Sequence, residues 1–375
     1  MTREEIHQLA LKEIDRNSYL VLELTTGFGK TRLAIDLINH ICNKLKKELS
    51  VLLLVAKRVH KQTWLDEITK WGGIKTSNIT IECYESLKKY NDSTFDIIVA
   101  DEMQHLSEAR LDILSTIKLN NNFIGLSATI KKNMRDYFIY KYKAHVIKCG
   151  LKDAIEDNVL PEPKVYLIPI KLDTTVHKYK IDRFKRTIIT TQKGYYDNIS
   201  SLVLWYKNKY LNSRNERIKT LWLSTAGKRL KWLSEQKESV IKTLLDKCRY
   251  VRTLTFCSSI DQSERLGKFN ITSKNKKSIE YLDMFNQNKI KHITSCAILN
   301  EGVNLYNCKV GIFGNLNSSE IITKQRIGRL LRHKNPIIIV PYYIGTREEE
   351  LVNKMMEEYT KESITVINNI NEIKL

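Results

Sequence analysis

The sequence predicts an α/β fold of two domains, in which each domain is a parallel sheet flanked by helices. Short apolar segments rich in β-branched residues alternate with longer amphipathic segments, a pattern typical of parallel sheets covered on both faces. The alternation runs through residues 1–150 and is repeated in the second half. The chain has 375 residues, of which 42% are hydrophobic, and this is enough to bury two cores.

The expected strands fall into two groups. In the first half they lie at 19–24, 51–56, 79–84, 95–101 and 123–129, and in the second half at 219–224, 252–259, 290–296, 309–314 and 336–344. Between the groups, Pro161 and Pro163 end a helical segment, because proline lacks a backbone donor and disfavours helix in the residue before it. We therefore expect a first domain at 1–150, a linker at 151–170 and a second domain at 216–375.

Residues 171–215 form a basic and aromatic insert ahead of the second domain. The stretch 171–219 has a net charge of +8 and is interleaved with tyrosine, tryptophan and phenylalanine. Basic residues mixed with aromatics suit a nucleic-acid strand, whose phosphates they neutralise and whose bases they stack on. An amphipathic helical insert whose aromatics pack on the domain is the equally open alternative.

Charge favours a polyanionic partner. The net charge is +20, of which +5 falls in residues 1–150 and +15 in residues 151–375. Such an excess indicates nucleic acid before a membrane surface. The seven cysteines contain no CxxC pair, so neither a zinc site nor a four-cysteine iron–sulfur cluster is predicted. The longest apolar runs are too short to cross a bilayer, and we expect a soluble, cytoplasmic protein without membrane contact.

The strongest local motif is LTTGFGKT at 24–31, which follows a predicted strand and opens a helical pattern. Such a loop binds nucleotide phosphates through backbone amides and a helix amino terminus, and the predicted ATP-binding residues are Thr26, Gly27, Gly29, Lys30 and Thr31. Lys30 would reach the β and γ oxygens, and the Thr31 hydroxyl would ligate Mg²⁺. Leu24 stands where the strict GxxxxGK[ST] pattern has glycine. A chance GKT in a turn is disfavoured by the flanking strand and helix.

An acidic pair follows the strand at 95–101. Asp101 would enter the Mg²⁺ shell, and Glu102 would orient or deprotonate the attacking water. In the second half, QRIGRLLRH at 325–333 places Gln325, Arg329 and Arg332 at i, i+4 and i+7 of one expected helix. Two guanidinium groups on one face can stabilise negative charge on a transferred phosphoryl group. A basic helix facing solvent or nucleic acid is the alternative.

In this order the motifs resemble those of superfamily-two helicases, over about residues 3 to 350. TTGFGKT is similar to that family's phosphate-binding loop, and Asp101-Glu102-Met103-Gln104 is similar to its DEAH-type box. Met103-Gln104 departs from the usual Ala or Cys followed by His, Asp or Gln. The resemblance implies two RecA-like P-loop NTPase domains, with ATP and Mg²⁺ in the cleft between them and Arg329 and Arg332 reaching across it.

Further residues take their roles from the resemblance alone. Gln8 would read adenine. Residues that would couple ATP to nucleic acid are Ser127 and Thr129 in LSAT, and Gly302 and Asn304 in EGVN, where relatives commonly have Asp at the last position. Residues that would contact a nucleic-acid strand are Lys57, Arg58, Tyr84, Ser86 and Ser258.

The sequence therefore predicts an ATP-dependent nucleic-acid helicase or translocase that works on DNA in preference to RNA. The chain resembles compact phage or bacterial DNA helicases, and a phage-encoded protein would act in the host cytoplasm. Such a two-domain motor can work as a monomer. Three alternatives stay open: a double-strand translocase that does not separate strands, an RNA helicase, and an inactive nucleic-acid-binding paralogue. Retention of both carboxylates and both arginines argues against the last.

Overall fold

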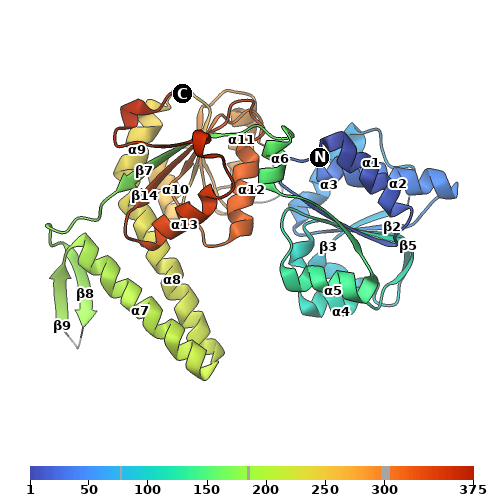
Figure 1. Ribbon diagram of the computed structural model, residues 1–375, viewed down its shortest axis with the longest axis horizontal. Helices are drawn as coiled ribbons and strands as arrows, with labels where there is room; N and C mark the ends of the chain where they lie inside the picture. Colours follow the sequence, from blue (N-terminus) through green and yellow to red (C-terminus); the bar gives the residue numbers. More distant parts are fainter. Residues whose placement is uncertain (77, 184–185, 297–304) are drawn as a thin grey trace. The chain divides into compact units, whose positions relative to one another are not determined.

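The computed structural model describes the chain except for residues 77, 184–185 and 297–304. The chain forms two compact units, each built on one parallel sheet (Figure 1). Among the described residues, unit 1 contains Met1–Glu162 and Lys324–Lys334, and unit 2 contains residues 163–296, Leu305–Thr323 and Asn335–Leu375. The predicted α/β class with two parallel sheets flanked by helices is confirmed.

Unit 1 is built on a six-stranded sheet with the order β3-β2-β4-β5-β1-β6, in which every pairing is parallel. Its strands are β1 (Tyr19–Leu24), β2 (Val51–Val55), β3 (Ile79–Cys83), β4 (Thr94–Ala100), β5 (Lys118–Ser127) and β6 (His145–Cys149). The sequence did not predict β6, an edge strand in which only Ile147 and Cys149 are buried. All five residues of β2 are buried, as expected of a central parallel strand covered on both faces.

The helical segments of unit 1 lie before, between and after its strands. They are α1 (Arg3–Ile14), α2 (Lys30–Leu45), α3 (Arg58–Lys70), η1 (Tyr84–Tyr90), η2 (Met103–His105), α4 (Glu108–Leu114), α5 (Lys132–Tyr142) and α6 (Leu151–Glu156). The beginning of α1 is fixed by a capping box, in which Thr2 accepts from the Glu5 amide and Glu5 accepts from the Thr2 amide. Because all strands of this sheet are parallel, the loops after β1, β2 and β4 lie at the same carboxyl edge, where ligands of such folds bind.

Unit 2 is built on a seven-stranded sheet with the order β11-β12-β10-β13-β14-β7-β15, again with parallel pairings. Its strands are β7 (Lys164–Ile170), β10 (Thr253–Phe256), β11 (Asn270–Ile271), β12 (His292–Ser295), β13 (Val310–Phe313), β14 (Ile337–Tyr343) and β15 (Ile364–Val366). Its helical segments are α9 (Glu238–Lys247), α10 (Ile260–Leu266), α11 (Ser278–Asn286), α13 (Arg347–Met356), η4 (Lys361–Ser363) and η5 (Ile370–Glu372). Helix α12 (Glu320–Leu330) begins in unit 2 and passes into the unit 1 segment at Lys324. Part of the expected linker, β7, is thus a strand of this sheet between β14 and β15.

The insert is a small antiparallel ribbon followed by a helical hairpin. The ribbon pairs β8 (Tyr179–Arg183) with β9 (Arg186–Thr190), and the hairpin pairs α7 (Gln192–Ser213) with α8 (Glu216–Gln236). The strand predicted at 219–224 is wrong, because this run lies inside α8. Within this run Trp222 packs against α7, with Tyr210 stacked on it at 5.9 Å between ring centroids. The hairpin extends away from the sheet of unit 2 (Figure 1).

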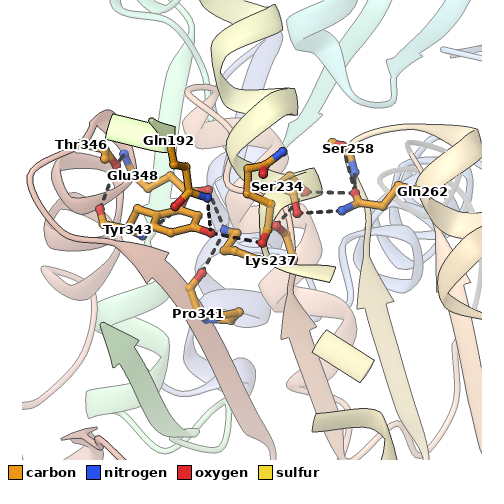
Figure 2. A network of polar contacts seen from close by, with 11 residues as sticks. Gln192, Ser234, Lys237, Ser258, Gln262, Pro341, Tyr343, Thr346 and Glu348 are labelled. Atoms are coloured by element: carbon orange, nitrogen blue, oxygen red, sulfur yellow. Dashed lines mark hydrogen bonds and ion pairs between the residues drawn. The ribbon is translucent and has the colours of Figure 1, made fainter. Parts of the chain in front are cut away.

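A buried polar network fixes the hairpin to this sheet (Figure 2). Lys237, between α8 and α9, has no exposed side-chain surface and donates to Glu348 Oε1 at 2.6 Å and to the Pro341 carbonyl at 2.9 Å. Glu348 also accepts from the Tyr343 amide at 3.1 Å. From α7, Gln192 Nε2 donates to the Tyr343 hydroxyl at 3.2 Å. Both helices of the hairpin therefore reach one shared cluster at β14.

Candidate ATP-binding site

The phosphate-binding loop joins β1 to α2 through two glycines in the left-handed region. Gly27 has φ +91° and Gly29 has φ +106°, which residues with a side chain rarely adopt. Gly29 caps α2 without a side chain, so the first amides of that helix are available to an anion. The Thr26 hydroxyl is buried and has no hydrogen-bond partner. A phosphate in this loop would supply the acceptors that these groups lack.

Lys30 points its ammonium at the end of β1. Its Nζ donates to the Leu24 carbonyl at 3.0 Å and lies 3.5 Å from the Thr25 carbonyl. Burial lowers the pKa of Lys30, while the charges of Glu102 and Asp101 act in the opposite direction. The ammonium is held by neutral carbonyl oxygens, which phosphate oxygens can replace as acceptors. This arrangement suits a phosphate-binding lysine.

Asp101 and Glu102 follow β4, which is separated from β1 only by β5. Burial and the neighbouring Glu102 charge raise the pKa of Asp101, and a hydrogen bond from Trp64 partly opposes this rise. The resulting pKa is about 7. Adjacent carboxylates, together with the Thr31 hydroxyl in the first turn of α2, suit a hard divalent cation such as Mg²⁺. No cluster of three or more His, Cys, Asp or Glu that could hold a metal occurs in the described residues. A cation here would therefore take further ligands from the nucleotide and water.

A chain of hydrogen bonds connects β5 to Glu102. The Ser127 hydroxyl donates to Gln104 Oε1 at 2.5 Å, and Gln104 Nε2 donates to Glu102 Oε2 at 2.6 Å. Glu102 itself has φ +50°, an uncommon conformation for a residue with a side chain. The Thr129 amide donates to Ser127 Oγ at 3.2 Å, and the buried Thr129 hydroxyl has no partner. The predicted coupling residues of LSAT are thus joined to the acidic pair through Gln104, whose part in this chain the sequence did not predict.

We expect Ser127→Ala to lower ATP turnover by roughly 3- to 10-fold, because one hydrogen bond is worth about 0.5–1.5 kcal/mol and its loss removes the donor to Gln104 Oε1, which helps to orient the amide that bonds to Glu102. The measurement is steady-state hydrolysis at saturating ATP. Ser115→Ala removes an exposed hydroxyl from the same unit and is the control. Equal turnover for both variants would show that the hydrogen-bond chain has no part in hydrolysis.

The segment Lys324–Lys334, which belongs to unit 1, carries the predicted arginines. Gln325 and Arg329 are buried, and the polar atoms of the Gln325 side chain have no hydrogen-bond partner. The prediction that all three residues share one helix is wrong for Arg332, because α12 ends at Leu330 ahead of the turn that leads to Pro336. Arg329 and Arg332 still lie close enough for their charges to act with burial in lowering the pKa of Lys30.

Glycine is required in the middle of that segment. A Cβ on Gly328 would lie 2.4 Å from the Cβ of Thr26 in the phosphate-binding loop. Any side chain at this position would push the segment away from the loop. The close approach therefore places Arg329 beside the loop.

The residues predicted to contact nucleic acid differ in accessibility. Lys57 and Arg58 are exposed at the beginning of α3, and Ser86 is partly exposed. Tyr84 is only 2% exposed, so its prediction as a direct strand contact is corrected: its hydroxyl donates to the Asp101 carbonyl at 2.8 Å. Ser258 Oγ donates to Gln262 Oε1 at 2.9 Å in unit 2.

The amino-terminal helix carries the residue predicted to read adenine. Gln8 is exposed and donates to Glu4 on its own helix at 2.8 Å, whereas Arg3 reaches the Gly27 carbonyl at 3.2 Å. The adenine-reading role of Gln8 stays a prediction. Gly302 and Asn304 lie outside the described residues. Within the described part of the chain, no helix is both long and apolar enough to span a membrane.

Two protein-family models match this sequence. The model described as type III restriction enzyme, res subunit, matches residues 2–93, which include the phosphate-binding loop. The model described as helicase conserved C-terminal domain matches residues 228–334, which include Ser258 and the arginine segment.

A curated relative and two solved structures resemble the whole chain. A DNA 3′-5′ translocase XPB2 of Sulfurisphaera tokodaii is 20% identical and aligns over 90% of this chain and 80% of its own length. The Hef helicase domain of Pyrococcus furiosus is 12% identical, with a TM-score of 0.55 over 93% of this chain and 97% of that one. Dbp5 of S. cerevisiae bound to RNA and ADP BeF3 is 11% identical, with a TM-score of 0.59 over 94% and 85% of the two chains.

Proposed function

Since this chain belongs to the superfamily-two helicases, a family of ATP-dependent helicases and translocases, we propose that it moves along DNA while hydrolysing ATP to ADP and phosphate. The observation that carries the proposal is the set of groups around Lys30. A loop with two left-handed glycines, a partly buried ammonium and an acidic pair backed by Gln104 and Ser127 together suit hydrolysis of a nucleoside triphosphate.

Each residue has a distinct task in this proposal. The amides at Gly27–Lys30 bind the phosphates, and Lys30 exchanges its carbonyl partners for phosphate oxygens. Glu102 holds the attacking water and receives its proton, while Gln104 fixes the direction of that carboxylate. Asp101 and Thr31 would hold Mg²⁺, which when bound neutralises charge on the phosphates. Arg329 and Arg332 would stabilise the charge that develops on the transferred group.

DNA is the preferred substrate in this proposal. The curated relative is named as a DNA translocase with 3′-5′ polarity, and the amino-terminal family model is that of a restriction-enzyme subunit. The fold does not discriminate, because Dbp5, a similar structure, is bound to RNA. We propose that the 3′-5′ polarity also applies here.

The helical hairpin offers a second surface for the strand. Trp205 on α7 is 51% exposed, and Lys209 Nζ lies 4.7 Å from the centroid of its ring. Lys207 and Arg214 are exposed on the same helix or at its end. An exposed aromatic ring beside cations suits stacking on bases and contact with phosphates. We assign the basic and aromatic insert to strand binding on these grounds.

We expect single-stranded DNA to stimulate ATP hydrolysis more strongly than RNA of matched sequence. The measurement compares steady-state turnover without nucleic acid and with single-stranded DNA, RNA, duplex and branched duplex. Arg332→Ala should lose roughly tenfold or more of the stimulated turnover, because its charge stabilises the transition state. Arg249→Ala, which removes an exposed arginine of unit 2, is the matched control.

The same experiment separates the alternatives. Greater stimulation by RNA would identify an RNA helicase, and stimulation by duplex without displacement of a labelled strand would identify a double-strand translocase. Absence of hydrolysis under every condition would leave a nucleic-acid-binding protein without motor activity.

A further inference from the structure

Two buried aromatic side chains end on Asp101. The indole Nε1 of Trp64 donates to Asp101 Oδ2 at 2.8 Å, and the hydroxyl of Tyr84 donates to the Asp101 carbonyl at 2.8 Å. Each side chain is only 2% exposed. One residue thus has both its carboxylate and its backbone held by donors that cannot turn without disturbing the core.

Both aromatics come from elements whose beginning carries a proposed strand contact. Trp64 lies on α3, for which Lys57 is the cap and Arg58 the first residue. Tyr84 opens η1, and Ser86 follows it two positions later. The elements come after β2 and β3, which lie on the same side of β4 in the order β3-β2-β4. Helix α3 and η1 therefore approach Asp101 from the side of the sheet on which the proposed nucleic-acid contacts lie.

The chemistry of these contacts allows a movement of α3 or η1 to change the orientation of Asp101. An indole N–H only donates, so Trp64 cannot compete with Asp101 for a cation. It fixes the direction of the carboxylate without removing its charge, as outer-shell partners of metal ligands do. Trp64 is also among the largest fully buried side chains of the chain, so a shift of α3 would carry the indole with it.

We propose that Trp64 and Tyr84 are positioning residues that couple strand binding at α3 and η1 to the orientation of Asp101. The inference rests on the proposed function, since it needs a strand at Lys57 and Arg58 and a nucleotide with Mg²⁺ at Asp101. A strand that holds α3 and η1 in place fixes the carboxylate, and a nucleotide bound at the carboxylate stabilises the same position of both elements. Linkage requires that each ligand then strengthens binding of the other by the same factor.

The test measures this factor directly and does not depend on turnover. Fluorescence anisotropy gives the affinity for labelled single-stranded DNA with and without a non-hydrolysable ATP analogue and Mg²⁺. A fluorescent ATP analogue with Mg²⁺ gives the affinity for nucleotide with and without DNA. The coupling factor is the ratio of the two affinities in either experiment, and factors of about 5 to 150 are usual.

Trp64→Phe keeps an aromatic ring and removes the donor, and Tyr84→Phe does the same at the second contact. The matched control is Trp71→Phe at the carboxyl cap of the same helix, which removes an indole donor that bonds to Glu67 at 2.8 Å and not to the acidic pair. We expect the coupling factor to fall at least about fivefold in both test variants. We expect each affinity measured alone to stay within about twofold of the unmodified protein, and the control to keep the whole factor.

Several results would overturn the inference. One is a coupling factor that is unchanged in both test variants. Another is an equal loss of the affinity for DNA alone and of the affinity for nucleotide alone. The third is an unmodified protein that binds DNA and nucleotide independently. If Trp64→Phe does not fold, Tyr84→Phe alone decides. An unmodified protein that binds no nucleotide or no DNA would instead refute the proposed function.

Discussion

Replacing Glu102 by Gln should lower ATP turnover by on the order of 10²- to 10⁴-fold, the usual contribution of a general base. The amide keeps the shape of the side chain and can still pair with Gln104, but it cannot accept a proton from water. Nucleotide affinity should change little, because the groups proposed to bind the phosphates belong to the loop and Lys30. Single-turnover hydrolysis and binding of a fluorescent ATP analogue measure the two properties separately.

The control for this experiment is Glu280→Gln on α11, an exposed glutamate of unit 2. It makes the same chemical change far along the chain from the loop and should leave turnover unaltered. Turnover of Glu102→Gln within about threefold of the unmodified protein would remove Glu102 from its proposed task, since such a loss is too small for a general base.

Lys237→Met should destabilise unit 2 by about 3–5 kcal/mol, because it leaves the Glu348 carboxylate buried without its cation. Burial already lowers the pKa of Lys237, and the charge of Glu348 opposes that shift. In a unit of this size, about 1 kcal/mol corresponds to roughly 2–4 °C, so calorimetry should show the transition lowered by about 6–20 °C.

Two further variants test the cause of that loss. Lys242→Met, at an exposed position of α9, should leave the transition where it is. Glu348→Gln added to Lys237→Met removes the unpaired charge, and the neutral amide can still accept from the Tyr343 amide, so much of the stability should return. A double variant less stable than the single one would show that packing, not charge, causes the loss.

The sequence predicted those features that depend on neighbours along the chain. The phosphate-binding loop needs glycines at fixed positions, a strand before it and a helix after it, and all of these are local. The acidic pair at the end of β4 is recognisable for the same reason. The run at 219–224 was misassigned because its apolar residues also fit a strand, and only packing against α7 decides in favour of α8.

Contacts between distant segments could not be predicted. Nothing around Trp64 in the sequence indicates that its indole meets Asp101, 37 positions later. The pairing of Lys237 with Glu348 spans 111 positions and depends on where α8 ends relative to β14. The chain from Ser127 through Gln104 to Glu102 likewise requires β5 to lie beside β4, which the sheet order supplies and the motifs alone do not.

The proposed base, Glu102, lies at a position where the backbone is in the left-handed region, which is unfavourable for a residue with a side chain. A residue with a side chain at φ +50° loses on the order of 1 kcal/mol relative to glycine. A substitution chosen only to relax this turn, such as glycine, would therefore stabilise the fold. It would also remove the carboxylate that is proposed to direct the water. If Glu102 has the proposed role, the chemistry of the site is obtained at a local cost in stability at this one peptide unit.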